Sequence, residues 1–252
     1  ARPPRASGRD FPLPQGLTSV EVGGVVVDQI NPVDRFPGRS LLAGLLANAL
    51  GMDYRDWAAV DRLQSRLRHA SRWDAEPERI VDYQTVDLGQ DCMTDTGWTT
   101  RGRREDRRGG EASSGTRQRY RHYWANGCAT VAFALSEVSV PGGRGSDHTP
   151  DLTTLEAALR RPARPLFIGR KTCLPAAPLL LGHREAAGLR LALEAEPQAD
   201  VSPRRQPRRL PACWPAEEGP GAQEIVLEDL RDWRNNVHRG SQRYAVGFLD
   251  LV

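Results

Sequence analysis

Apolar residues recur at helical spacing in three segments of the chain. Residues 40–50 are almost entirely apolar and are followed by Gly51, which predicts a helix that ends at this glycine. Between residues 54 and 72 the apolar positions fall three or four apart, which predicts a second helix with one buried face. A third helix is expected over residues 151–161, where three leucines share one side and Pro162 follows the last turn.

Shorter runs of apolar and β-branched residues predict strands between these helices. In chain order the predicted strands are Val20–Ile30, Ile80–Val86, Thr130–Leu135, Leu166–Lys171, residues 186–194 and Tyr244–Leu249. Residues 1–19 are basic and proline-rich and are expected to be irregular, and residues 201–221 are expected to form a proline- and arginine-rich linker. The order of the elements is that of an α+β, ferredoxin-like βαββαβ domain with insertions, which would span residues 20–252.

The apolar pattern disappears between about residues 88 and 124, although strand-like sequence lies on both sides of this segment. A structureless loop of this length is uncommon within a compact domain, so we expect a long β-hairpin arm with a mobile tip. Residues 97–124 contain eight arginines and three acidic residues, a net charge of +5, whereas the rest of the chain sums to −2. The basic character of the protein therefore comes from this arm.

Arginine supplies 34 of the 35 basic residues, and Lys171 is the single lysine. The guanidinium group binds phosphate through two hydrogen bonds and stacks on bases, which suits RNA. A GC-rich genome would also favour arginine codons throughout the chain, so the positions of the arginines carry more weight than their number.

The start of the first predicted helix is a candidate anion site. Ser40 is a suitable N-cap, and Arg35 and Arg39 stand beside the backbone N–H groups of the first turn. Free N–H groups and the positive end of the helix dipole favour a phosphate. A buried helix with an unusual start explains the same residues equally well, with Asp34 as a cap or as the partner of Arg39.

Several classes of protein are not expected. The chain has no run of 18 apolar residues, so no membrane span is predicted. The four cysteines are far apart and form no C-x-x-C pair, which argues against a zinc knuckle and fits a reducing, cytoplasmic compartment. The sequence has no metal-ligand cluster and no phosphate-binding G-x-x-x-x-G-K-[ST] loop, so we expect neither a metal nor another cofactor.

Four segments, in their order and spacing, resemble the CasD family, whose members are subunits of the type I-E CRISPR surveillance complex, Cascade. The segments are Asp34–Gly51, Asp82–Val86, Gly97–Gly102 and Arg164–Pro175. The resemblance covers about residues 30–185, with a weaker similarity over Asp229–Arg234. The chain departs from the family at residues 20–27, which are a poor copy of the apolar strand with which the family usually begins.

The resemblance implies a ferredoxin-like (RRM-type) domain with a β-hairpin thumb, which holds the 5′ handle of the CRISPR RNA (crRNA) at one end of the complex. It also implies the backbone and large subunits of Cascade as partners, indirect contact with target DNA through the complex, and a role in antiviral defence. In subtype I-E a separate endonuclease cuts the RNA, so the resemblance implies a structural role.

The candidate RNA-binding residues follow from these patterns. They are Arg35, Arg39 and Ser40 at the helix start, Trp98, Arg101, Arg117, Arg119, Tyr120 and Arg121 in the arm, and Arg170 and Lys171 after a predicted strand. Strand alternation would place the arginines at 117, 119 and 121 on one face, and an aromatic ring of the arm would offer a stacking surface. The alternatives are a solvated hairpin, an arm that grips an adjacent subunit, and a plain surface turn at 170–171.

No catalytic residue is assigned. The alternative function is a metal-independent endoribonuclease that processes CRISPR repeat RNA, because His122, a tyrosine and Lys171 could supply a base, an acid and a cation for the phosphorane. The other histidines have no partners at diagnostic spacing. We therefore predict a non-catalytic RNA-binding subunit.

Overall fold

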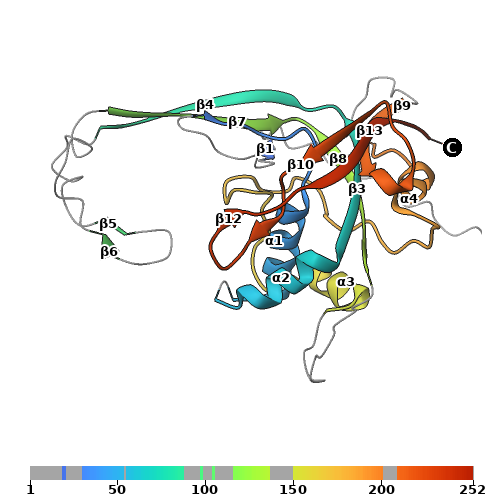
Figure 1. Cartoon of the computed structure of the whole chain (residues 1–252), viewed down its shortest axis with the longest axis horizontal. Helices are drawn as coiled ribbons and strands as arrows, with labels where there is room; N and C mark the ends of the chain where they lie inside the picture. Colours follow the sequence, from blue (N-terminus) through green and yellow to red (C-terminus); the bar gives the residue numbers. More distant parts are fainter. Residues whose placement is uncertain are drawn as a thin grey trace, which may run out of the picture.

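The computed structural model describes residues 19–20, 30–53, 55–87, 97–98, 104–105, 116–136, 150–200 and 209–251, which form a mixed α/β structure with largely antiparallel sheets (Figure 1). The helices are α1 (Arg39–Leu50), α2 (Trp57–Arg66), α3 (Leu152–Arg160), α4 (Leu189–Ala195) and the short 3-10 helix η3 (Ala216–Glu218). The strands are β1 (Ser19–Val20), β2 (Ile30–Asn31), β3 (Leu67–Ala75), β4 (Glu78–Asp87), β5 (Gly97–Trp98), β6 (Arg104–Glu105), β7 (Thr116–Ala125), β8 (Cys128–Leu135), β9 (Arg209–Pro215), β10 (Gln223–Leu227), β11 (Arg231–Asp232), β12 (Val237–His238) and β13 (Gln242–Asp250). None of the helices in this part of the chain is long and apolar enough to cross a membrane.

The main sheet has five antiparallel strands in the order β10-β13-β9-β3-β8. Figure 1 shows α1, α2 and α3 on one side of this sheet and α4 on the other. Successive residues of a strand point to opposite faces, so a strand covered on both sides is apolar at successive positions. The sequence of β8, Cys-Ala-Thr-Val-Ala-Phe-Ala-Leu, has this character.

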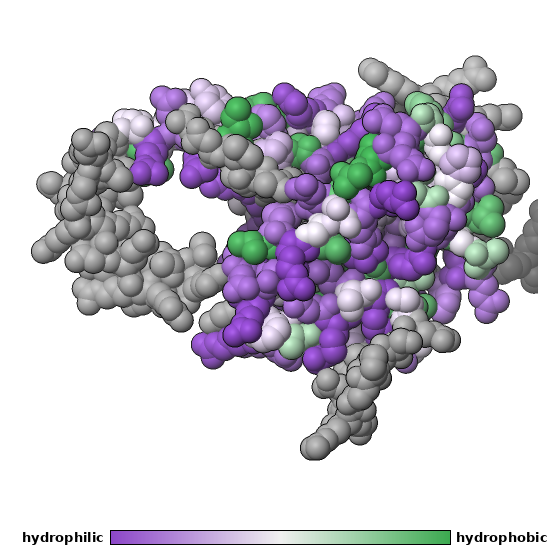
Figure 2. Space-filling view, in the orientation of Figure 1, coloured by the Kyte–Doolittle hydropathy of each residue, from purple (hydrophilic) through white to green (hydrophobic). Residues whose placement is uncertain are grey.

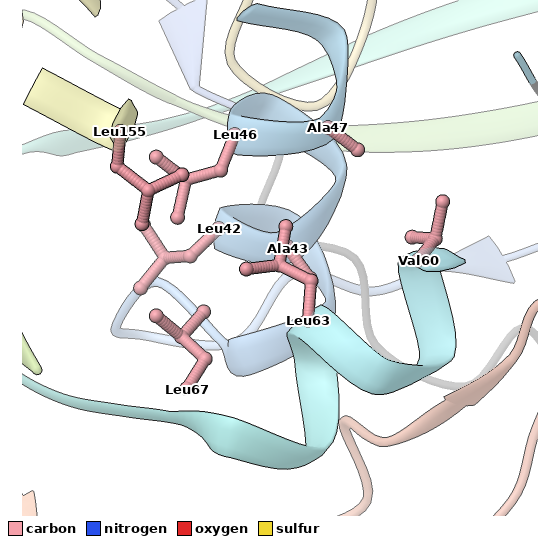
Figure 3. Packing of buried hydrophobic residues seen from close by; sticks show 8 residues of the cluster. All are labelled: Leu42, Ala43, Leu46, Ala47, Val60, Leu63, Leu67 and Leu155. Atoms are coloured by element: carbon pink, nitrogen blue, oxygen red, sulfur yellow. The ribbon is translucent and has the colours of Figure 1, made fainter. Parts of the chain in front are cut away.

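The helical layer packs on the sheet through leucines (Figure 3). Leu42 and Leu46 of α1, Leu63 of α2 and Leu155 of α3 meet in one buried cluster, against which residues of β8 also pack. Helix α1 ends at Gly51, whose φ of 74° is left-handed and whose N–H closes the last turn. The predicted end of this helix is confirmed, and glycine suits the position because other residues are strained at positive φ.

The other face of the sheet presents small residues to α4. Ala70, Ala212 and Ala245 come from three neighbouring strands and lie in one buried cluster with Leu189 and Leu193 of α4. Because alanine side chains are short, the helix approaches the strands closely and both leucines are buried.

A fully buried arginine closes the C-terminal end of α4. Arg72 of β3 pairs with Asp74 at 2.7 Å, and neither side chain has exposed surface. The Arg72 guanidinium also donates to the carbonyl oxygens of Leu193, Glu196 and Pro197. Carbonyls at a helix C-terminus lack partners within the helix, so this arginine satisfies them and holds α4 on the sheet.

β4 and β7 form an antiparallel arm that projects from the main sheet, and the short strands β1 and β2 pair with β7 on its other edge (Figure 1). The arm keeps the register of the sheet, because Ala75 pairs with Cys128 at the end of β3 and Glu78 pairs with Ala125 at the start of β4. In the predicted tip, β5 pairs with β6, and the rest of the tip lies outside the described residues. The expected hairpin is thus present where Glu78–Asp87 pair with Thr116–Ala125, whereas most of residues 88–115 lies outside the described residues.

The predicted second helix is too long. It ends at Arg66, and the next residue begins β3, an inner strand of the main sheet. Leu67 and Ala70 fit helical spacing in the sequence, yet they are buried on opposite faces of β3, one beneath α1 and the other beneath α4. A strand that is covered on both faces therefore shows the same apolar spacing as a helix.

Three further predictions are wrong. Residues 186–194 are not a strand, because Leu189–Ala195 form α4 and place two leucines four residues apart on the sheet. Residues 166–171 form bends and turns, and the Ile168 N–H closes this loop on the Cys173 carbonyl at 2.8 Å. The segment predicted as a linker contains β9, which lies between β13 and β3. Prolines and arginines around β9 give a buried strand the composition of a linker.

Other predictions are confirmed or lie outside the described residues. Strands β4, β8 and β13 contain the strands predicted over residues 80–86, 130–135 and 244–249, and α3 lies within the helix predicted over residues 151–161. The strand predicted over residues 20–30 is described only at its two ends, which belong to β1 and β2. The irregular segment predicted for residues 1–19 lies outside the described residues except for its last position.

Candidate nucleic-acid interface

The arm carries three arginines on one face. In an antiparallel pair, residues directly opposite each other point to the same side, and alternate residues of a strand share a face. Arg117 lies opposite Val86, and Arg121 lies opposite Asp82. The three arginines at 117, 119 and 121 therefore share one face, as their alternation predicts. Arg117 and Arg119 are exposed, whereas Arg121 is half-buried nearer the main sheet.

The opposite face of the arm is aromatic. Tyr120 lies directly opposite Tyr83, and their ring centroids are 5.1 Å apart. The two tyrosines are 39% and 51% exposed, respectively, and Ile30 of β2 pairs with Tyr120 on its other side. Figure 2 shows hydrophilic and hydrophobic residues close together along the described part of the arm. The predicted stacking ring, Tyr120, thus lies on the face that does not carry the three arginines.

The loop that contains Arg170 adds a further arginine beside the three arginines of β7. Arg170 donates a hydrogen bond to the Tyr123 hydroxyl at 2.8 Å, and its guanidinium carbon lies 5.3 Å from the centre of that ring. Tyr123 follows Arg121 by two residues and therefore belongs to the same face. Lys171, the next residue in the loop, is exposed. We call the surface formed by Arg117, Arg119, Arg121 and Arg170 the arginine face.

The N-terminal end of α1 is closed by a carboxylate of the same chain. The N-cap is Gly38 and not Ser40, and the Arg39 N–H donates to the Asp229 carboxylate. Asp229 is only 2% exposed. A Cβ atom at position 38 would lie 2.8 Å from Asp229 Oδ2, so glycine is what leaves room for this contact. The predicted N-cap is therefore wrong, and a phosphate at this N–H group would have to displace Asp229.

Two acidic groups lie close to this helix start. Burial raises the pKa of Asp229 above its ordinary value, while the hydrogen bond and the charge of Arg39 act in the opposite direction. The pKa of Asp34 is raised to about 6, first by burial and then by repulsion from Asp229. Their negative charge reduces the positive potential that α1 offers to an external anion.

The residues before α1 are fixed by contacts with neighbouring strands. Arg35 pairs with Glu76 of the turn between β3 and β4 at 2.6 Å. The indole N–H of Trp73 donates to the Arg35 carbonyl at 3.0 Å, and that of Trp124 donates to the Asp34 carbonyl at 2.7 Å. The segment that leads into α1 is thus held at the junction of the main sheet and the arm.

Arg39 lines a polar cavity of about 530 Å³ together with Arg68 and Arg243. The Arg39 Nε atom is shielded from solvent and has no hydrogen-bond partner among the described residues. Arg68 pairs with Glu217, which lines the same cavity. The sequence did not indicate Arg68 and Arg243 as candidates, because their approach to α1 depends on the pairing of β9 with both β3 and β13 within the main sheet.

The remaining candidates are only partly described. Ser40 is the second residue of α1 and is half-buried. Trp98 belongs to β5, but its side chain and the whole of Arg101 lie outside the described residues. These three residues stay predictions.

A comparison with models of known protein families identifies the family of the chain. The model of the family described as CRISPR-associated protein (Cas_Cas5) matches residues 22–244, a span that contains α1, the arm and most of the main sheet. The chain belongs to the CRISPR-associated Cas5 family.

Relatives of this Cas5-family chain include a curated bacterial protein. The chain is 32% identical over 166 residues to "CRISPR system Cascade subunit CasD" of Escherichia coli (strain K12). The match covers 64% of this chain and 65% of the relative, so it spans slightly less than two thirds of the length of that protein.

Solved structures share the fold of the Cas5-family chain. A chain of a "CRISPR RNA-guided surveillance complex" matches with a TM-score of 0.63 and 22% identity, covering 93% of this chain and 87% of that one. A "Crystal structure of Cas protein" matches with a TM-score of 0.52 and 21% identity, covering 94% of this chain and 95% of that one. At these identities the likeness concerns the fold alone.

In the described part of the Cas5-family chain, no group of three or more His, Cys, Asp or Glu could hold a metal ion. The alternative catalytic site is metal-independent, so the positions of His122 and Lys171 bear on it. By strand alternation His122 shares the face of Tyr120, whereas Arg170 contacts Tyr123 on the arginine face. The proposed base and the loop that carries Lys171 therefore meet different faces of the arm.

Proposed function

We propose that this chain is a non-catalytic subunit of a type I-E CRISPR surveillance complex (Cascade) and that it binds and caps the 5′ handle of crRNA. Membership of the Cas5 family and the identity to a Cascade subunit of E. coli support its assignment to such a complex. The observation that carries RNA binding is the arginine face, because it gathers four guanidinium groups on one side of a projecting arm.

The arginine face suits a single-stranded RNA backbone. Alternate residues of a strand stand about 7 Å apart along the arm. Each guanidinium can bind a phosphate through two parallel hydrogen bonds, so the backbone could pass from one arginine to the next. Such contacts position RNA without reading its sequence. Sequence would be read by bases that leave the backbone and stack on a ring, for which Tyr120 and Trp98 are the candidates.

We assign a second, weaker contact to the start of α1, formed by Arg35, Arg39 and Ser40. The cavity beside Arg39 and its unpartnered Nε atom support a phosphate site there. Because Asp229 already holds the first N–H of the helix, this contact would rely on arginine side chains rather than on the helix dipole. Lys171 would add a further positive charge at the base of the arm.

In this proposal the main sheet and its helices are a ferredoxin-like (RRM-type) core, and the arm is its thumb. The partners are the crRNA handle and the backbone and large subunits of the complex, which contacts target DNA as a whole. The complex acts in the cytoplasm, in defence against viruses.

The RNA that co-purifies with the chain tests the proposal. A tagged chain expressed with its complex should retain RNA that begins with the repeat-derived handle, as determined by sequencing. The arm triple variant combines Arg117→Gln, Arg119→Gln and Arg121→Gln. It should retain at most about one tenth of the wild-type amount of this RNA, because three phosphate contacts are lost.

A control triple variant removes the same charge from the main body. It combines Arg160→Gln, Arg209→Gln and Arg239→Gln, whose arginine side chains are 62%, 69% and 77% exposed. The control should retain the wild-type amount of RNA. An equal loss in both variants would show that net charge and not the arginine face holds the RNA, and RNA without repeat sequence would contradict the handle assignment.

Incubation with repeat RNA in the presence of a chelator distinguishes this function from an endoribonuclease. We expect the RNA to stay intact. Specific cleavage by the purified chain that disappears in His122→Ala would replace the proposed function with the catalytic one.

A further inference from the structure

The hairpin formed by β11 and β12 is a surface to which the proposed function assigns no role. Among the described residues, its two strands pair only with each other. It overlaps Asp229–Arg234, the segment with a weaker similarity to the CasD family. Residues 234–240 are all exposed, and Figure 1 shows the hairpin apart from the arm, at the side of α1. A segment related to the family thus leads into a turn that the described part of the fold does not cover.

The base of the hairpin is fixed to the helical layer. Gln64 of α2 is buried, and its Oε1 atom accepts the Arg231 N–H at 3.2 Å and the Trp233 indole N–H at 3.1 Å. The Gln64 amide also donates to the Arg231 carbonyl at 2.9 Å. Trp233 packs on α1, where a Cβ atom at Gly44 would lie 3.2 Å from its Cη2 atom. These contacts stabilise the fold and explain the residues before the turn.

The turn of the hairpin is held by hydrogen bonds of its own. The Asp232 carboxylate accepts the N–H groups of Arg234 and Asn235, each at 3.0 Å. The Asn236 N–H donates to the Asp232 carbonyl at 2.7 Å, and the φ of Asn236 is 61°, in the left-handed region. Arg239 pairs with Asp232 at 3.6 Å. The backbone of the turn is therefore fixed before any partner binds, which lowers the entropic cost of binding.

An arginine stacked on a tryptophan lies at the outer surface of this turn. The Arg234 guanidinium carbon is 5.3 Å from the centre of the Trp57 ring, at the start of α2. Arg234 is exposed and forms no ion pair with a described carboxylate. The acidic residues before Trp57, Asp53 and Asp56, accept backbone N–H groups of their own turn. Residues 231–243 contain four arginines and one acidic residue, a net charge of +3, so the hairpin attracts negative groups.

The chemistry of these side chains favours a protein partner over RNA. Because the Arg234 guanidinium lies over the Trp57 ring, less of that ring is open to a stacking base. Val237 is 54% exposed, and its aliphatic side chain suits an apolar recess and not a phosphate. Tryptophan and arginine carry much of the binding energy at protein interfaces. The N–H groups at the edge of a stacked guanidinium can still bind a carboxylate through two hydrogen bonds.

We propose that Trp57, Arg234 and Val237 form a docking surface for another protein subunit of the complex, which presents carboxylates beside an apolar recess. This inference rests on the proposed function, because it takes the partner from the same complex. Arg239 is left out of the docking surface, since its guanidinium is paired with Asp232. The arginine face and the docking surface would then serve different ligands, RNA and protein.

Cross-linking in the purified complex tests the docking surface. A carbodiimide joins a lysine amine directly to a carboxylate, and Lys171 is the only lysine of the chain. Arg234→Lys therefore adds one amine at the hairpin and keeps the charge. Peptide mapping should find residue 234 joined to an Asp or Glu of another subunit. The matched control is Arg209→Lys, because Arg209 is also exposed and stacks on a ring, that of Phe248, at 5.2 Å. It should give at least about fivefold less cross-link to another subunit.

Charge reversal gives a second readout. In the co-expressed complex, Arg234→Glu should lower the amount of the cross-linked subunit that co-purifies by at least about fivefold, whereas Arg209→Glu should keep the wild-type amount. The midpoint of urea unfolding should be the same in both variants. If the wild-type complex assembles, equal cross-linking at positions 234 and 209 or unchanged subunit ratios in Arg234→Glu would overturn this inference alone. Loss of RNA with all subunits retained would assign the hairpin to RNA instead. A wild-type chain that co-purifies with no other subunit would contradict the proposed function itself.

Discussion

Two regions of this chain concentrate arginines in the sequence, and the fold uses them differently. At the start of α1, the Arg39 N–H is held by Asp229, and the Arg35 guanidinium is paired with Glu76. Along β7, by contrast, arginines on alternate residues share one face of the arm, and two of the three are exposed. Both regions look like anion sites in the sequence. Arginine density alone therefore does not distinguish a helix start that is already closed by groups of the same chain from the face that we propose as the main RNA site.

Burial explains the difference between the two regions. Helix α1 begins against the main sheet, where an unpaired N–H group would be costly, so the chain supplies its own carboxylate. The outer part of the arm, where β7 pairs with β4 alone among the described residues, has no core of its own, and Arg117 and Arg119 are exposed there. The following predictions test this contrast, from the largest expected effect to the smallest.

Arg72 is a fully buried arginine whose contacts stabilise the fold. Arg72→Met should lower the free energy of unfolding by about 3–5 kcal/mol, because Asp74 would stay buried without its partner. Urea unfolding at pH 7 measures this loss. Arg117→Met on the arginine face should change stability by no more than about 0.5 kcal/mol. Similar losses in the two variants would contradict the contrast between the regions.

His69 makes the closed end of α1 sensitive to acid. Its Nε2 donates to the Pro37 carbonyl at 2.9 Å, its Nδ1 lies 3.1 Å from the Tyr244 hydroxyl, and burial lowers its pKa to about 4. Between pH 6.5 and 4, His69 is protonated in the unfolded chain but stays neutral in the folded chain. Stability should therefore fall as the pH drops through this window, by about 3 kcal/mol from this group.

A comparison of the wild type with His69→Gln isolates this contribution. Asp34, with its pKa raised to about 6, acts in the opposite direction, because its protonation below pH 6 favours the folded state. The difference in unfolding free energy between the wild type and His69→Gln should shrink as the pH falls from 6.5 to 4. A difference that stays constant with pH would contradict a neutral, buried His69.

Asp229 is the residue that closes α1. Asp229→Ala removes the cap and should lower the free energy of unfolding by about 1–2 kcal/mol. RNA affinity should change by less than about threefold, since the proposed function assigns most of the phosphate contacts to the arm. Asp250→Ala, at an exposed position of β13, is the matched control for stability. A large change in RNA affinity in Asp229→Ala would move the main RNA site to the helix.

Local patterns predicted the parts of the fold that depend on neighbouring residues. The end of α1 at Gly51, the helix α3 and the alternation of the arm arginines follow from the sequence alone. The spacing of Leu67 and Ala70 led to a wrong prediction of helix, because burial on both faces of the strand β3 reproduces helical spacing.

The missed features depend on contacts between distant segments. Asp229 reaches Arg39 across 190 positions of sequence, and Arg170 joins the arm through Tyr123 across 47 positions. No local pattern indicates either contact. The sequence therefore indicated which residues could bind an anion, but only the tertiary structure showed that Asp229 already holds the start of α1.

The salt dependence of RNA affinity tests the arginine face most directly. The logarithm of the binding constant for a labelled single-stranded handle RNA is measured against the logarithm of salt concentration. Each phosphate contact on single-stranded RNA contributes a slope of about −0.7, so the arm triple variant should be less steep than the wild type by about 2. The control triple variant should keep the wild-type slope. Equal slopes for the wild type and the arm triple variant would contradict the account.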